Sequence, residues 1–384
     1  MNFSIPEALV LERKEFKDFA KAHVGGPLPS WTRSGEIPKS FFRHMGKGGW
    51  YGFRLRRGRL EKRSVLREAV LSEVLAEVSP GVAIASLAHI DLGFMGLAMF
   101  GTEALRDRYA RQVVAGEKIM CLGNTENTAG SDVAGIRMTA EKVDGGWRLD
   151  GTKAFVTNGA MADLAVITAV TDPDAPRNRR ISMFLVDLGD PGVRRTKLNK
   201  GVWIPSDLTR LRLSEVFVAD DHLLGRRGHG LRQVLEVFTR SRIPISALTL
   251  GTATGAFKLA LDHGVNRRIF GAPIVDFQAK AFEIAEHAAR IEAARLMVYK
   301  ACQTADAGED FRNEAAMAKY LTVDLARQVT AWSADLFGAV SVIFEHPVHK
   351  FPLDAWASSL GEGTQDVQKL VIYREVMKRF GKKG

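Results

Sequence analysis

Residues 147–159, WRLDGTKAFVTNG, are the clearest strand-like stretch in a chain of 384 residues. The stretch is rich in aromatic and β-branched residues, and turn residues separate it from similar runs at 163–171, 181–188 and 214–221. On both sides of these runs, apolar residues follow the period of amphipathic helices. The order helix, strand, helix predicts an α+β protein that is mainly helical.

This change of period divides the chain into three regions. We predict a helical N-terminal domain over residues 1–118, a middle β domain, barrel or sheet, over 119–225, and a C-terminal helical bundle over 226–384. Asp144-Gly145-Gly146 predicts the tip of a hairpin, and Gly271-Ala272-Pro273 separates two helices. Two helical lobes around a β domain commonly enclose a ligand cleft.

The composition is that of a globular protein, with 46% hydrophobic and 26% charged residues. The longest apolar runs are short and interrupted, so we expect no membrane span. The N-terminal MNFSIPEALVLERKEF reaches charged residues too early for a secretory leader. Cys121 and Cys302 are the only cysteines, too few for a disulfide framework or a metal cluster. A cytoplasmic location is therefore expected.

Basic residues outnumber acidic ones by 54 to 44, which gives a formal net charge of +10. A basic surface attracts polyanions, so nucleic acid is one conceivable partner. However, the chain has no zinc-finger spacing, homeodomain or RNA-binding signature. We expect no nucleic-acid partner and interpret the basic clusters as a solvated face, with a docking patch for a phosphate-bearing or acidic partner as the alternative. Their members are Arg54, Arg56, Arg57, Arg59, Lys62 and Arg63, then Arg177, Arg179 and Arg180.

Near the C-terminus, residues 358–366 read SSLGEGTQD and hold Glu362 between two glycines. Glycine is used where the backbone bends unusually or something approaches it closely. Thr364 can cap the amphipathic helix that follows, so Glu362 is expected on a tight turn at a helix N-terminus. The alternative is an ordinary exposed loop acid.

Several common catalytic motifs are missing. No GxGxxG follows a strand and no GxxxxGK[ST] is present, so a Rossmann nicotinamide site or a P-loop is unsupported. HExxH and GxSxG are also absent. The histidines lack metal-ligand spacing, and we predict no metal site. In contrast, residues 125–132, TENTAGSD, combine hydroxyls with small residues, a composition that lets backbone amides and hydroxyls meet a flat polar ligand.

Four segments, in the same order, resemble the acyl-CoA dehydrogenase family. TENTAGSDVAG at 125–135 resembles the family's TEPGAGSDxxG, and GTKAFVTNG at 151–159 resembles its GxKxxITNG. RRIFGAPI with Phe277-Gln278, at 267–278, is similar to RxxFGxPIxxFQ. EHPVHK followed by GEGT, within 345–364, resembles YPVEK…YEGT. Weaker similarities at 100–119 and 223–225 extend the resemblance over essentially the whole chain.

The resemblance implies a three-domain fold: an N-terminal helical domain, a middle β domain and a C-terminal four-helix bundle. It also implies FAD, a homotetramer or homodimer, a role in fatty acid metabolism and electron-transfer flavoprotein as the acceptor. The reaction implied is α,β-dehydrogenation of an acyl thioester, in which a carboxylate removes the α-proton and the β-hydrogen leaves as a hydride to flavin N5. Coenzyme A is the usual carrier; an acyl carrier protein is possible because of the basic N-terminal patch.

By position in the family's motif, Glu362 is the proton-abstracting base. Some relatives carry this base one residue before Arg242, but Ser241 stands there and cannot act as one. Arg242, Ser131 and Gly363 match positions beside the thioester. The resemblance implies FAD contacts from Leu122, Asn124, Thr125, Ser131, Phe155, Thr157, Arg267, Phe270, Gln278, Ala339, Thr364 and Asp366, with Arg267, Phe270 and Gln278 reaching the adenosine diphosphate of a neighbouring subunit's FAD.

Some positions depart from the family pattern. The QxxGGxG element reads DLFGAVS at 335–341, and Asp366 replaces a glutamine. Added negative charge is expected to weaken FAD retention unless Arg267 or Arg268 compensates. A basic segment at 51–63 replaces a glycine-rich PEEYGG. Two alternatives therefore stay open: a flavin-dependent monooxygenase on the same fold, whose members generally lack the base, and a non-catalytic relative that has lost FAD.

Overall fold

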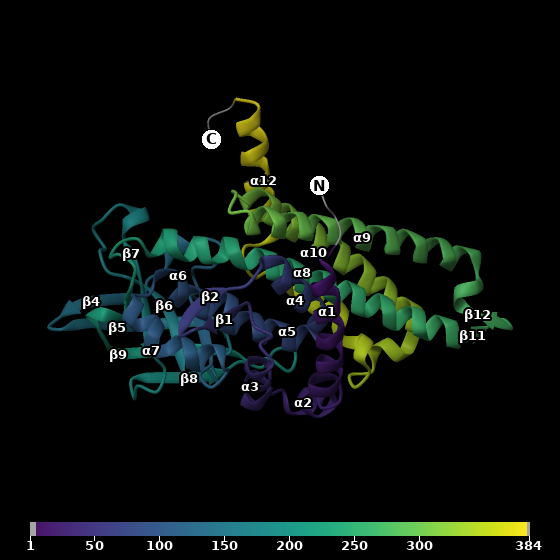
Figure 1. The fold of residues 1–384 in the computed structure, drawn as a ribbon, viewed down its shortest axis with the longest axis horizontal. Coiled ribbons are helices and arrows are strands. Elements are labelled where there is room, and N and C mark those ends of the chain that lie inside the picture. The colour runs from purple at the N-terminus through teal and green to yellow at the C-terminus, as the bar shows by residue number, and fades with distance from the viewer. Residues whose placement is uncertain (1–4, 382–384) are drawn as a thin grey trace.

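The computed structural model describes residues 5–381 and shows helical elements around and beside a mixed sheet (Figure 1). Residues 1–4, the start of the segment considered above as a leader, lie outside the described residues. The N-terminal region contains α1 (Glu7–Ala20), α2 (Leu28–Ser34), α3 (Lys39–Lys47), α4 (Val65–Val78), α5 (Pro80–Leu87), α6 (Met95–Phe100) and α7 (Glu103–Val114), with π-helical turns η1 (Lys21–Gly25) and η2 (Ala88–Phe94).

One hairpin in this region is not among the predicted elements. Strands β1 (Phe53–Arg56) and β2 (Arg59–Lys62) pair antiparallel, with Leu55 opposite Leu60. Arg57 and Gly58 in the turn both have positive φ, 51° and 78°, as a two-residue hairpin of this hand requires. The alternation of apolar and basic residues in FRLR has the two-residue period of a strand, which is too short a signal to stand out between helices.

The middle region is an eight-stranded mixed sheet in the order β10-β7-β6-β4-β5-β9-β8, with β3 parallel to β6. The predicted hairpin tip is confirmed, because β4 and β5 pair antiparallel around Asp144 and Gly145. The strands are β3 (Met120–Gly123), β4 (Thr139–Val143), β5 (Gly146–Thr157), β6 (Leu164–Val170), β7 (Ile181–Asp187), β8 (Val193–Lys197), β9 (Leu208–Ala219) and β10 (Leu223–Leu224).

In the C-terminal region the long helices α8, α9 and α10 lie alongside one another, and α12 projects from them (Figure 1). The predicted break between two of them is confirmed as a small hairpin of β11 (Arg268–Ile269) and β12 (Ala272–Pro273). Buried hydroxyls in α8, such as those of Thr249 and Thr252, donate to carbonyls four residues earlier, which satisfies them inside the core. The helices are α8 (Gly230–Asn266), α9 (Gln278–Asp306), α10 (Arg312–Phe337), α11 (Phe351–Ala357) and α12 (Gln365–Arg379).

Helix α4 joins the N-terminal region to the C-terminal helices. Its buried Val70 lies in one apolar cluster with Ile243 of α8. The Asp306 carboxylate at the end of α9 accepts hydrogen bonds from the Val65 N–H (2.7 Å) and the Ser64 hydroxyl (2.7 Å), and so caps the start of α4. The three regions are therefore packed against each other through α4 and α8.

One helical stretch, Pro80–Phe100, is long and apolar enough to cross a membrane by length and composition. The sequence-based expectation that every apolar run is too short is therefore wrong for this stretch. Its most apolar window is 78% buried within the protein, and Ile90 and Phe94 belong to the main apolar core. It is the core helix of the N-terminal region.

Gly116 links the N-terminal helices to the sheet and offers a test of this packing. Its φ is +68°, and a Cβ there would lie 2.0 Å from the Phe42 carbonyl oxygen. Gly58 has a similar φ of +78° but nothing within 4 Å of its Cβ position. We expect Gly58→Ala to cost about 1 kcal/mol, from the left-handed backbone alone. Gly116→Ala should cost roughly 2–5 kcal/mol, because a backbone clash adds to the strain. Equal effects in denaturant unfolding would contradict the packing described.

Candidate active site

Glu362 lies on a strained turn immediately before α12. Its backbone φ is 50° and that of Gly363 is 91°, and its side chain is only 8% exposed. The Thr364 hydroxyl accepts a hydrogen bond from the Val367 N–H (3.4 Å), so the predicted N-cap is confirmed. A buried carboxylate at a positive φ excludes the alternative of an ordinary exposed loop acid.

Two buried cations from separate helices hold this turn. Lys319 of α10 donates to the carbonyls of Gly361 and Gly363. Arg242 of α8, whose surface is 7% exposed, donates from Nε to the Glu362 carbonyl (3.3 Å). These donors bind main-chain carbonyls, so the turn is fixed while the carboxylate is left to face another group.

A third donor reinforces the turn from within α12. Gln368 Nε2 donates to the carbonyls of Gly363 (2.8 Å) and Glu362 (3.2 Å). Sequence reasoning did not single out Gln368 or Lys319. The signal available was one charged residue, Lys319, inside the otherwise small and apolar run AAMAKYL, and its burial shows why it is there.

Burial controls the electrostatics of the turn. It raises the pKa of Glu362, although the charges of Lys319 and Arg242 oppose the shift. It lowers the pKa of Lys319 to about 8 and also lowers the pKa of Arg242. A carboxylate whose pKa is raised holds a proton more strongly than one in water, which suits a general base.

The middle sheet carries one outward-facing aromatic side chain, Phe155, which we call the platform. Phe155 lies in a bulge of β5, between Lys153 and Val156 in the register with β9. Its φ of 57° turns the ring outward, and the residue is 58% exposed. The Ala154 N–H donates to the Thr125 carbonyl (2.8 Å), which brings the 125–132 loop beside this bulge.

This contact brings together four of the residues implied in the flavin site. They are Leu122 at the end of β3, Thr125, Phe155, and Thr157 at the end of β5. Asn124 belongs to the same loop, but it is buried and its Oδ1 accepts from the Thr168 hydroxyl (2.9 Å). Its side chain therefore supports the loop from below. Ser131 is exposed farther along the loop. An outward aromatic ring beside hydroxyls fits a flat polar ligand such as a flavin.

A buried ion pair beneath the platform was missed by sequence reasoning. Lys153 donates to Glu126 Oε1 (2.8 Å) and to the Asn124 carbonyl (3.1 Å). Glu126 also accepts from the N–H groups of Arg137 (2.8 Å) and Met138 (3.0 Å). The pair therefore fixes the loop to β5. The available signal was one charged residue in each of two otherwise uncharged motif cores, TENT and GTKAF.

The residues expected to contact the FAD of a neighbouring subunit lie far from the Phe155 platform. Arg267 and Gln278 lie before and after the β11–β12 hairpin and Phe270 lies in its turn; the hairpin is at the opposite end of the molecule from the mixed sheet (Figure 1). Phe270 is 97% exposed, at a φ of 47°. Within one chain the structure does not bring them to the platform. Ala339 is exposed in the turn after α10, whereas Asp366 starts α12 with its carboxylate 3.3 Å from Lys369 Nζ.

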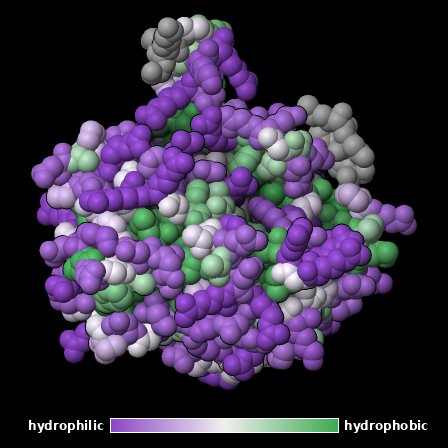
Figure 2. Space-filling view, turned by 60° about the vertical axis from the view of Figure 1, so that its left-hand side comes forward, coloured by the Kyte–Doolittle hydropathy of each residue, from purple (hydrophilic) through white to green (hydrophobic). Residues whose placement is uncertain are grey.

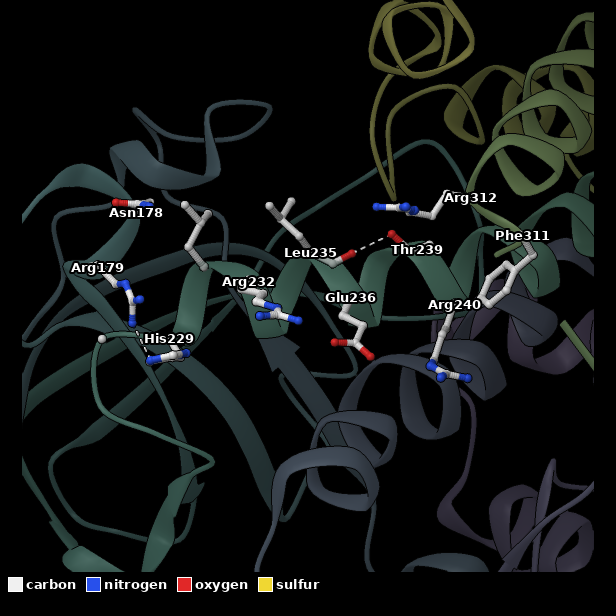
Figure 3. Close-up of a pocket in the computed structure, with 12 residues that line it drawn as sticks. Asn178, Arg179, His229, Arg232, Leu235, Glu236, Thr239, Arg240, Phe311 and Arg312 are labelled. Carbon is white, nitrogen blue, oxygen red and sulfur yellow. Dashed lines mark hydrogen bonds between the residues drawn. The ribbon is translucent and has the colours of Figure 1, made fainter. Parts of the chain in front are cut away.

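A basic groove of about 750 Å³ runs along the first half of α8 (Figure 3). Arg240, with its guanidinium 5.9 Å from the Phe311 ring centroid, lies two residues before Arg242 on the same helix. The groove and the Glu362 turn therefore share two helices, α8 and α10, since Arg312 begins the helix that carries Lys319. Sequence reasoning did not predict it, although Arg179 was named in a basic cluster. It is lined by Asn178, Arg179, Gly228, His229, Leu231, Arg232, Leu235, Glu236, Thr239, Arg240, Phe311 and Arg312.

The face that is turned toward the mixed-sheet side of the molecule is mainly hydrophilic, with scattered apolar patches (Figure 2). Among residues 5–381, no group of three or more histidine, cysteine, aspartate or glutamate side chains is arranged to hold a metal ion. Both cysteines are buried and unpaired, and burial raises the pKa of each thiol.

The chain matches three sequence profiles in succession. They are described as the N-terminal (residues 7–117), middle (121–216) and C-terminal (228–377) domains of acyl-CoA dehydrogenase. The chain therefore belongs to the acyl-CoA dehydrogenase family, whose members are oxidoreductases acting on CH–CH groups. Family and fold confirm the resemblance seen in the sequence.

Individual relatives agree over the full length. An acyl-CoA dehydrogenase of Bacillus subtilis is 30% identical over 379 residues, covering 97% of this chain and 99% of the relative. The caffeyl-CoA reductase-Etf complex subunit CarC of Acetobacterium woodii is 30% identical, covering 96% and 97%. Butyryl-CoA dehydrogenase from Megasphaera elsdenii superposes with a TM-score of 0.93 at 30% identity, covering 98% and 100%. The structure of PigA with FAD and proline superposes at 0.93 and 26%, covering 99% and 100%.

Glu362→Gln tests the electrostatics of the turn. The raised pKa means that ionised Glu362 opposes folding, so the amide should stabilise the protein at pH values above that pKa. The gain should shrink as pH falls toward the ordinary carboxyl value of 4.5, where both states are protonated. Each tenfold change in proton affinity is worth about 1.4 kcal/mol. Melting temperatures across pH would check this, with exposed Glu141→Gln as the control; a gain independent of pH would contradict it.

Proposed function

We propose that this chain catalyses FAD-dependent α,β-dehydrogenation of an acyl thioester, with Glu362 as the base. The observation that carries the proposal is the geometry of Glu362: buried, on a strained turn, and fixed through its neighbouring carbonyls by Lys319 and Arg242. Membership of the family supports the reaction class.

The chemistry asked of the chain is removal of a weakly acidic proton. The Glu362 carboxylate takes the α-proton of the thioester, and its raised pKa makes it a stronger base for a carbon acid. The Glu362 N–H donates to the thioester oxygen and stabilises the negative charge that develops there. When bound, FAD would supply the acceptor for the β-hydrogen, which would leave as a hydride. The positive charge of Arg242 beside the turn favours the negatively charged groups of the reacting centre.

The residues present fit FAD in two places. Leu122, Thr125, Phe155 and Thr157 would hold the flavin ring, with Ser131 at its edge near the thioester. Thr364, at the start of α12, would serve the diphosphate side, where helix amides favour phosphate, whereas the Asp366 carboxylate beside it would repel the phosphates. This agrees with FAD in a similar solved structure, that of PigA.

A second copy of the chain would complete the cofactor site. The β11–β12 hairpin, with Arg267, Phe270 and Gln278 in or next to it, lies far from the mixed sheet of its own chain, and Phe270 is almost fully exposed. Ala339 follows the end of α10, which packs in one cluster with Ile274 beside this hairpin. We therefore propose a homodimer or homotetramer in which the β11–β12 hairpin of one subunit reaches the FAD of another. The weakening of FAD retention by Asp335 and Asp366 remains a prediction.

Coenzyme A is the carrier that the basic groove favours. Arg179 and Arg232 can neutralise phosphates, and the apolar Leu231 and Leu235 beside them suit a pantetheine arm. Arg312, also in the lining, is paired with Asp310. An acyl carrier protein is the second candidate, because the exposed basic hairpin β1–β2 offers a docking surface for an acidic partner. By analogy with the CarC subunit, an electron-transfer flavoprotein would reoxidise the flavin. The cytoplasmic location remains a prediction.

Anaerobic mixing with acyl thioesters tests the reaction. Wild-type protein with FAD should show bleaching of the flavin absorbance without NADPH, and Glu362→Gln should retain FAD but lose bleaching by about 10²–10⁴-fold, the usual contribution of a general base. Bleaching that survives in Glu362→Gln would exclude Glu362 as the base. FAD bound without bleaching by any thioester would favour the monooxygenase, and failure to bind FAD would favour the non-catalytic alternative.

A comparison of acyl-CoA with acyl-pantetheine tests whether the groove binds the coenzyme A carrier. Arg179→Ala and Arg232→Ala should raise KM for acyl-CoA by roughly tenfold to a hundredfold, the effect of losing a hydrogen bond to a charged group. The same substitutions should leave the KM for acyl-pantetheine unchanged, since this substrate has no nucleotide phosphates. Arg59→Ala in the hairpin is the matched control and should weaken only an acyl carrier protein substrate. Equal losses with acyl-CoA and acyl-pantetheine would contradict the assignment of the groove.

A further inference from the structure

A small cavity in the N-terminal region contains two acids that the proposed mechanism does not use. Its volume is about 40 Å³, enough for only a few heavy atoms, and it is enclosed by α1, α3, α4, α5 and η2. Most of its lining is apolar, including Phe16, Met45 and Leu75. Glu68 of α4 and Asp91 of η2 also face it.

Both carboxyl groups are buried and incompletely bonded. Glu68 is 8% exposed and Asp91 is 6% exposed. Within the described part of the chain, Glu68 Oε1 and Asp91 Oδ1 have no hydrogen-bond partner. Burial raises the pKa of Asp91, and the charge of Glu68 and a hydrogen bond between the two carboxyl groups raise it further, while Lys62 opposes the shift more weakly. The two acids thus bond one another through one oxygen each and leave Glu68 Oε1 and Asp91 Oδ1 without a partner among the described residues. The pair therefore retains hydrogen-bonding capacity that its own surroundings do not satisfy.

The backbone beside the pair leaves room for it. A Cβ at Gly52 would lie 2.0 Å from Glu68 Oε1, so any larger residue would push the carboxylate away. Apolar residues in place of a buried acid pair are often neutral or stabilising for a protein. Some oxygens of these two acids have no partner within the described residues. This is a reason to look for a ligand group that bonds them.

The cavity adjoins the Glu362 site. Ser72, which lines the cavity, donates from its hydroxyl to the Pro244 carbonyl (3.2 Å). Pro244 lies two residues beyond Arg242, which donates to the Glu362 carbonyl. In addition, the charge of Glu362 is close enough to raise the pKa of Asp91. The cavity and the Glu362 turn therefore contact the same segment of α8, and we infer that an acyl group whose α-carbon is at Glu362 extends toward these acids.

We propose that Glu68 and Asp91 recognise a hydrogen-bond donor, a hydroxyl or an ammonium group, carried on the acyl chain of the substrate. This inference rests on the proposed function. A donor on the chain satisfies the unpaired oxygens, whereas a plain hydrocarbon chain leaves them buried and unpaired, which disfavours it. Sites built to bond a polar substrate group discriminate strongly against the analogue that lacks it.

Matched thioesters test the proposal. The probes are acyl-CoA series of increasing length that end in a hydroxyl, an amino or a methyl group. Their dissociation constants are measured by calorimetry on the FAD-loaded Glu362→Gln protein, which separates binding from turnover, and kcat/KM is then measured on the wild type. The expected result is a preference of at least about tenfold for one polar terminus over methyl at one chain length; the hydroxyl and amino arms show which donor is taken.

Variants show whether the acids cause that preference. Glu68→Leu/Asp91→Leu should reverse it toward methyl, and Glu68→Gln should reduce it, whereas exposed Glu141→Gln should leave it unchanged. FAD content and melting temperature show that each variant is folded. Preference for methyl at every length, a preference unchanged in the double variant, or no binding of any thioester would overturn the inference. Polar preference in binding without any turnover would contradict the proposed reaction and leave the recognition by Glu68 and Asp91 supported.

Discussion

The site depends on a buried lysine bonded to the two carbonyls that flank one glutamate. Lys319 fixes Gly361 and Gly363 from α10, while Arg242 fixes Glu362 itself from α8. Burying a cation is costly unless it is hydrogen bonded and paired with opposite charge, and the turn supplies both. The same arrangement holds Glu362 at a positive φ and keeps its carboxylate out of water. A strained, desolvated carboxylate is thus held by main-chain contacts and stays available for chemistry.

The three regions of the fold each bring one part to this turn. The C-terminal helices supply Glu362 and its two cations, and both α8 and α10 contribute residues to the basic groove and to the turn. The middle sheet supplies an outward aromatic ring in a bulge, which is anchored by the buried Glu126–Lys153 pair. The N-terminal helices supply the cavity with Glu68 and Asp91. Substrate carrier, flavin and acyl chain would each meet a different region, and the packing of α4 on α8 places those regions together.

The sequence predicted the features that have local signatures. The β-rich run around residues 147–159, the cap at Thr364 and the glycine-flanked Glu362 all rest on neighbouring residues. Lys319, Gln368 and the Glu68–Asp91 pair were not predicted, because their roles depend on contacts between residues far apart in the chain. Asn124 was predicted beside the flavin but lies beneath the loop, since burial and its bond to Thr168 decide its direction. The β1–β2 hairpin was missed because four-residue strands carry little periodicity.

The most direct test of Glu362 as the base is exchange of the substrate's α-protons with deuterated water, followed by NMR. The probe is an acyl-CoA in which sulfur replaces the β-carbon, so that proton removal can occur without dehydrogenation. Wild-type protein with FAD bound should catalyse exchange, and Glu362→Gln with FAD bound should not. Exchange at equal rates in the two proteins would show that another group removes the proton and would contradict the catalytic role of Glu362.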